Sequence, residues 1–120
     1  MRTTQEQKQI ISELNQNTGS QQYFKIPFSK IVYTEGIEDL IKRCGCWWLI
    51  SDLGIELSNQ EKPFLIVRIE VNEDDSAIIT LKEDSDLEII YKKEIGYTDF
   101  SLKEFEFYLI DKVFLLKNEY

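Results

Sequence analysis

The spacing of hydrophobic residues changes once along this chain, near Pro63, and this change limits the fold more than any other feature. After Pro63, inward and outward positions alternate through runs such as "FLIVRIEV" and "AIITLK", a pattern typical of strands. The short polar stretches "NEDDS", "EDSD", "GYTDFS" and "DK" separate these runs. Because short connections join antiparallel neighbours, this half of the chain predicts an antiparallel, meander-like sheet of about five strands.

Before Pro63 the spacing favours helices. Residues 4–16 carry a narrow apolar stripe, and residues 34–44 place apolar side chains at i, i+3, i+4 and i+7 behind Thr34, a suitable N-cap. The run "CWWLISDLGIEL" is apolar almost all round, as in a largely buried helix. The stretches "YFKIPF" and "KIVYT" look extended, and Pro27 favours an edge or loop position for the first.

We therefore expect a single α+β domain over residues 1–120, in which residues 1–62 are mainly helical and residues 63–120 form antiparallel strands. The N-terminal helices would pack on one face of the sheet, because helices followed by strands are typical of a two-layer α+β domain.

The second face of the predicted sheet is unusually apolar. If Leu65, Ile79, Ile89 and Phe107 face the helices, alternation turns five other large side chains the opposite way: Ile66, Ile78, Ile90, Tyr108 and Ile110. A solvated face of an antiparallel sheet is normally more polar, so we expect a cover. The cover is either the N-terminal helix, or a second copy or foreign protein that binds this face.

The net charge of −8 is unevenly distributed. Residues 63–120 hold 14 acidic and 7 basic groups, whereas residues 1–62 hold 8 and 7. This balance disfavours direct binding of nucleic acid and favours a basic protein partner. We expect five acidic residues of two predicted turns to steer such a partner: Glu73, Asp74, Asp75, Asp84 and Asp86.

Few chemistries fit the remaining residues. The chain has no histidine, so we expect neither a His-based acid–base pair nor an enzyme. Cys44 and Cys46 are interpreted as small buried side chains, and no metal or cofactor is expected. An alternative role is a small-ligand or metal-binding module whose pocket is formed by Trp47, Trp48 and Asp52. No apolar run could cross a membrane and no signal peptide is evident, so we expect a cytoplasmic protein.

Five stretches, "VYTEG", "CGCWWL", "VNEDDSA", "IGYTDF" and "LLKNEY", resemble a family of small uncharacterised proteins encoded mainly by bacterial phages, plasmids and other mobile elements. The similarity spans about residues 20–120 in the same order. The resemblance implies an accessory protein of a mobile element that inhibits a host defence system, such as a CRISPR effector, by occupying a basic groove. It brings no catalytic or cofactor-binding residues with it.

Overall fold

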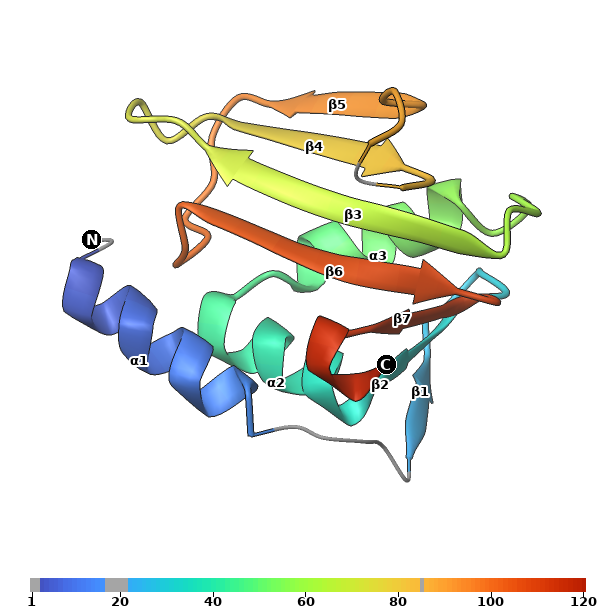
Figure 1. Cartoon of the computed structure of the whole chain (residues 1–120), viewed down its shortest axis with the longest axis horizontal. Helices are drawn as coiled ribbons and strands as arrows, with labels where there is room; N and C mark the ends of the chain where they lie inside the picture. Colours follow the sequence, from blue (N-terminus) through green and yellow to red (C-terminus); the bar gives the residue numbers. More distant parts are fainter. Residues whose placement is uncertain (1–2, 17–21, 85) are drawn as a thin grey trace.

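The computed structural model describes residues 3–16, 22–84 and 86–120. Three α-helices, α1 (Thr4–Leu14), α2 (Glu35–Cys44) and α3 (Trp47–Glu56), accompany one sheet. Its strands are β1 (Tyr23–Lys25), β2 (Val32–Thr34), β3 (Phe64–Val71), β4 (Ala77–Lys82), β5 (Tyr91–Ile95), β6 (Glu104–Ile110) and β7 (Val113–Leu115). A short 3-10 helix, η1 (Lys117–Glu119), follows β7 (Figure 1).

The predicted fold class is wrong in its sheet. The sheet has seven strands in the order β1-β2-β7-β6-β3-β4-β5, and β2 pairs with β7 in parallel, so it is mixed and not a five-stranded antiparallel meander. The helices are also not all placed before the strands, since β1 and β2 precede α2. The α+β content is confirmed. The error arose because alternation shows which face a side chain occupies but not which strand lies next to it.

Strands β3, β4 and β5 are successive neighbours in the sheet, but β6 does not pair with β5. Residues 96–103 carry the chain from the edge strand β5 past the β3–β4 turn to the other side of β3, where β6 pairs (Figure 1). This connection is anchored, because Thr98, Phe100 and Leu102 are buried within it. The N–H of Thr98 also donates to the carbonyl of Asp75 at 2.8 Å. The sequence analysis interpreted the start of this segment as a turn and missed its buried side chains.

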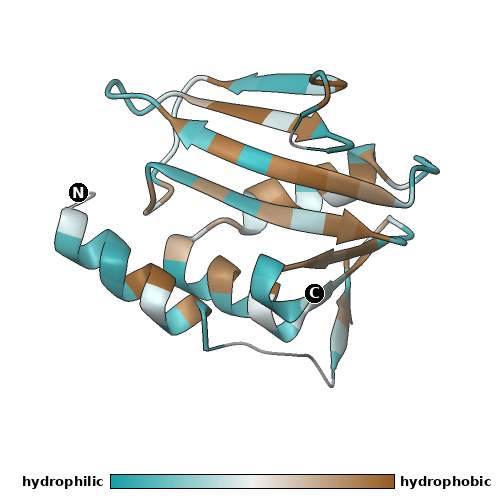
Figure 2. Ribbon diagram, viewed as in Figure 1, coloured by the Kyte–Doolittle hydropathy of each residue, from teal (hydrophilic) through white to brown (hydrophobic). Residues whose placement is uncertain are grey.

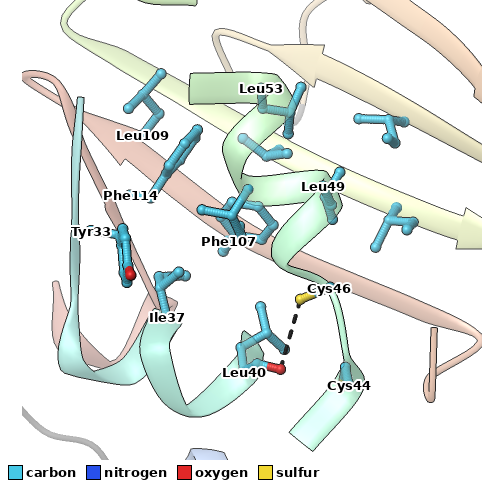
Figure 3. Close-up of a cluster of buried hydrophobic side chains, with 14 of the residues drawn as sticks. Tyr33, Ile37, Leu40, Cys44, Cys46, Leu49, Leu53, Phe107, Leu109 and Phe114 are labelled. Carbon is cyan, nitrogen blue, oxygen red and sulfur yellow. Dashed lines mark hydrogen bonds between the residues drawn. The ribbon is translucent and has the colours of Figure 1, made fainter. Parts of the chain in front are cut away.

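The core lies between one face of the sheet and helices α2 and α3. Leu65, Ile79 and Phe107 are buried in it, as predicted. The prediction that Ile89 also faces the helices is wrong, because Ile89 lies before β5 and is half exposed. Phe114 of β7 packs in the same core as Phe107 (Figure 3). Helix α2 buries Ile37, Leu40 and Cys44, and its predicted N-cap is confirmed: the N–H of Ile37 donates to the Thr34 hydroxyl. Gly45 adopts a left-handed conformation (φ 61°) at the end of this helix. Glycine adopts this conformation at the lowest conformational energy because it has no Cβ.

Helix α1 lies against α2 and leaves the opposite face of the sheet uncovered (Figure 1). Glu13 of α1 forms an ion pair with Arg43 of α2, and the backbone N–H of Lys103 donates to the side chain of Gln7 at 2.8 Å. Ile10 packs against the core and Leu14 is buried in it. The N-terminal helix is therefore not the cover that the apolar second face of the sheet was expected to have.

Candidate functional site

A cleft of about 850 Å³ opens between α1 and the connection that follows β5. One wall is α1 and the end of α2, and the other is the β3–β4 turn with residues 97–101. Its lining residues are Glu6, Gln9, Ile10, Glu13, Arg43, Asp75, Tyr97, Thr98, Asp99 and Ser101. A cleft of this volume is large enough for a drug-sized ligand or several residues of a peptide.

The cleft is strongly acidic. Four carboxylates line it, those of Glu6, Glu13, Asp75 and Asp99, against the single guanidinium of Arg43. That guanidinium is already engaged, because its Nε donates to Asp39 at 2.9 Å and its Nη1 pairs with Glu13. The potential in the cleft is therefore negative, and a cation would gain more there than an anion.

The acidic wall at the β3–β4 turn has a defined geometry. Asp75 is in the left-handed region (φ 66°), and its N–H donates to the carbonyl of Asn72. Asp74 accepts from both the N–H and the hydroxyl of Ser76, and these hydrogen bonds lower its pKa below the ordinary range. The turn thus keeps the Asp74 carboxylate ionised, and the hydrogen bond from the Thr98 N–H to the Asp75 carbonyl holds the turn next to residue 98.

Tyr97 is the aromatic residue of the cleft. Its side chain is 65% exposed, although large aromatic side chains are usually buried to a greater extent. A second hollow of about 310 Å³ adjoins the cleft and is lined by Trp48, Tyr97, Thr98 and Asp99. Trp48, Tyr97 and Asp99 therefore line the same hollow, a combination that suits a cationic group with an apolar stem.

The structure separates the two acidic turns that the sequence analysis grouped. Asp75 lines the cleft, and Glu73 and Asp74 lie exposed beside it in the same turn. Asp84 and Asp86 are exposed at the other end of β4, away from the cleft (Figure 1). Only the first turn therefore contributes to this site.

The pocket suggested around Trp47, Trp48 and Asp52 does not form as a unit. Trp48 lines the hollow beside Tyr97, whereas Trp47 packs against the ring of Tyr33 with centroids 5.9 Å apart. Asp52 forms an ion pair with Lys93 of β5, which also contacts Glu56 at 3.0 Å. These carboxylates tie α3 to the edge strand and raise the pKa of Lys93, which stays charged.

The two cysteines are buried and reduced, as interpreted from the sequence. Burial raises the pKa of the Cys44 thiol to about 11 and raises that of Cys46 further. The Cys46 thiol also donates to the carbonyl of Leu40 at 3.7 Å (Figure 3). Both thiols are poor nucleophiles in this environment.

The predicted second face exists, and we call it the outer face: the strand side chains that point away from α2 and α3. Ile66, Ile78, Tyr108 and Ile110 lie on it, with Ile66 directly opposite Tyr108 on the neighbouring strand. Ile90 does not, because β5 begins only at Tyr91. The β4–β5 connection is longer than the predicted turn and includes Leu87, Ile89 and Ile90, each about half exposed.

Of the ten residues that line the cleft, only Asp75 was a predicted site residue. Sequence reasoning missed the other nine, among them Glu6, Glu13, Tyr97 and Asp99. No local pattern connects the first helix to the turn after β5, because the chain separation between them is about 90 residues. The only local sign was "GYTDFS", a polar stretch with an aromatic residue between two strands.

Among residues 3–16, 22–84 and 86–120, no three Cys, Asp or Glu side chains gather closely enough to hold a metal ion. In the same ranges, none of the helices combines the length and hydrophobicity needed to span a bilayer.

Comparison with known proteins identifies a family. Residues 8–120 match the model of a family of unknown function, DUF6876, so the chain belongs to that family. The resemblance to an uncharacterised family is thus confirmed. No curated protein and no solved structure matches the chain.

Proposed function

We propose that this member of a family of unknown function is a non-enzymatic accessory protein that binds another protein, and that its acidic cleft receives a basic segment of the partner. The observation that carries the proposal is the cleft, which is lined by four carboxylates and by one guanidinium that is already paired with one of them. Lysine or arginine side chains would meet carboxylates on both walls and could stack on Tyr97.

The residue types that the chain offers favour a binding role over His- or thiol-based catalysis. The chain has no histidine, and the pKa values of both thiols are raised by burial.

We further propose a setting for this binding. The resemblance to proteins of bacterial phages and plasmids favours an inhibitor of a host defence system in the cytoplasm. Effectors that handle nucleic acid, such as CRISPR nucleases, carry basic grooves, and an acidic cleft is complementary to a basic loop at such a groove. Binding would then weaken as salt rises, because the interaction is between charges at an exposed surface.

The test is calorimetric titration of the purified protein with a short arginine-rich peptide. In the variant Glu6→Lys/Asp99→Lys, affinity should fall at least about 10-fold, since close charge pairs couple by about 1.5 kcal/mol or more. The matched control is Asp84→Lys/Asp86→Lys, which changes the net charge equally at exposed positions outside the cleft. Equal losses in the two variants would refute the cleft and leave only nonspecific attraction.

A small organic cation is the second candidate ligand, because Trp48 and Tyr97 form an aromatic-lined hollow next to the carboxylates. Titration with a free polyamine in place of the peptide separates the two. A polyamine that binds as tightly as the peptide would favour the small-ligand module over the protein-binding role.

A further inference from the structure

The outer face of the sheet divides into an apolar end and a charged end. On β3 the side chains of this face run from Phe64 and Ile66 to Arg68 and Glu70, and on β6 they run from Ile110 and Tyr108 back to Glu106 and Glu104. In Figure 2 the ribbons of β3 and β6 are coloured as hydrophobic towards the right of the view, and the arrowhead of β3 is coloured as hydrophilic.

The apolar end continues onto neighbouring elements. Tyr120 packs edge-on against Phe64 and Tyr108, with ring centroids 6.2 and 5.7 Å away, yet it is 80% exposed. Beside it lies a hollow of about 310 Å³, whose lining residues are Tyr23, Thr34, Ile110, Asp111, Val113, Leu115, Glu119 and Tyr120. A protruding ring and a mainly apolar hollow therefore lie next to each other on one surface.

The charges of this face are balanced, unlike those of the whole protein. The strand side chains of the outer face include four cations, Lys25, Arg68, Lys82 and Lys92, and four anions, Glu70, Glu94, Glu104 and Glu106. The chain as a whole carries a net charge of −8, so the entire excess of negative charge lies elsewhere. Arg68 already bonds Glu70, Glu104 and Glu106, at 2.6, 2.7 and 3.2 Å.

We propose that the outer face is the interface of a symmetric dimer of this chain, with the apolar end at its centre. The chain as a whole carries a net charge of −8, so two copies repel each other on average, whereas the strand side chains of the outer face carry no net charge. In a two-fold pairing the same patch meets itself, so Tyr120 of each copy enters the hollow of the other. The charged side chains form the rim around an apolar centre, as in stable interfaces.

This dimer does not depend on the proposed function, because none of the residues that line the cleft is a strand residue of the outer face. Salt is expected to change dimerisation through the outer face and peptide binding in the cleft in opposite directions. Between about 0.1 and 1 M NaCl the Debye length falls from about 10 to 3 Å, which weakens the repulsion between two acidic copies. The dimer should therefore tighten as salt rises, whereas peptide binding in the cleft should weaken.

Sedimentation velocity over a concentration series, at low and high salt, tests the inference. The wild type should form a dimer whose dissociation constant is lower at high salt, and Tyr120→Glu should raise that constant at least about 10-fold. Tyr23→Glu is a second variant at an exposed position of the same patch, and Tyr97→Glu is the control on the cleft side. Circular dichroism establishes that each variant is folded.

A monomer at all concentrations and both salt conditions would overturn the inference. A dimer that neither Tyr120→Glu nor Tyr23→Glu weakens would also overturn it, as would a dimer that dissociates on addition of salt. Peptide binding by the cleft, measured on the same samples, remains a separate result and decides the proposed function.

Discussion

Glu119 links the C-terminal 3-10 helix to the start of α2, and its removal gives the most quantitative prediction. Its carboxylate accepts from the Thr34 hydroxyl at 2.7 Å, from the N–H of Leu116 at 2.9 Å and from the N–H of Gly36 at 3.2 Å. A partly exposed hydrogen bond contributes about 1 kcal/mol net. Glu119→Ala should therefore cost about 3 kcal/mol, or about 12 °C in Tm, given about 2.1 cal/mol/K per residue.

A substitution at Gly36 tests the contact between Glu119 and the start of α2 independently. A Cβ at this position would lie 2.2 Å from Oε1 of Glu119 and 2.8 Å from Cδ1 of Leu116, so the carboxylate would have to leave. Alanine normally stabilises a helix by about 1 kcal/mol relative to glycine. Gly36→Ala should instead destabilise the wild type by about 2 kcal/mol, and should be close to neutral once Glu119 is alanine.

Urea denaturation of the wild type, the two single variants and the double variant measures this coupling. We expect a coupling free energy of about 2 kcal/mol, because both substitutions remove the same hydrogen bonds. Lys117→Ala, in the same 3-10 helix, is the control and should cost less than about 1 kcal/mol, since its ion pair with Glu106 is partly exposed. Additivity within about 0.5 kcal/mol would refute the account of Glu119 and Gly36.

Two further predictions concern titratable groups, and one concerns an ion pair. A thiol reagent at neutral pH should modify Cys44 and Cys46 only after unfolding, since burial raises their pKa values; fast labelling of the native protein would contradict this. Burial, with hydrogen bonds to glutamates, raises the pKa of Tyr33 and Tyr91 to about 12. The contribution of these two tyrosines to stability is thus present below about pH 10 and is lost as the pH rises towards 12. If an absorbance titration showed all tyrosines ionised by about pH 11, the raised pKa values would be contradicted. Lys93→Met should cost only about 0.5–1 kcal/mol, because its partners on α3 are partly exposed, and a loss above about 2 kcal/mol in denaturant would show a larger role.

The parts of the fold that local spacing determines could be predicted. Helix α2 is an example, since Thr34, the apolar face and Gly45 all act within a few residues of one another. The alternation in β3, β4 and β6 likewise assigned Ile66, Ile78 and Tyr108 to one face. These features depend on backbone geometry that repeats every two or 3.6 residues.

Strand neighbours could not be predicted, because they depend on contacts between distant parts of the chain. The parallel pair of β2 with β7 joins Val32 to Val113, and neither stretch of sequence indicates the other. The position of β5 was misjudged because Leu87, Ile89 and Ile90 continue its alternation although they belong to the connection. The cleft was missed for the same reason, since Glu6 and Asp99 come to line one cleft only in the folded chain.

The central claim, that the cleft between α1 and residues 97–101 receives a cationic segment, is tested most directly by nuclear magnetic resonance. Titration of ¹⁵N-labelled protein with an arginine-rich peptide should shift the amide resonances of residues 6–13, Asp75 and 97–101, and should leave those of Asp84 and Asp86 unchanged. Shifts centred on Asp84 and Asp86, or on the outer face of the sheet, would contradict the account.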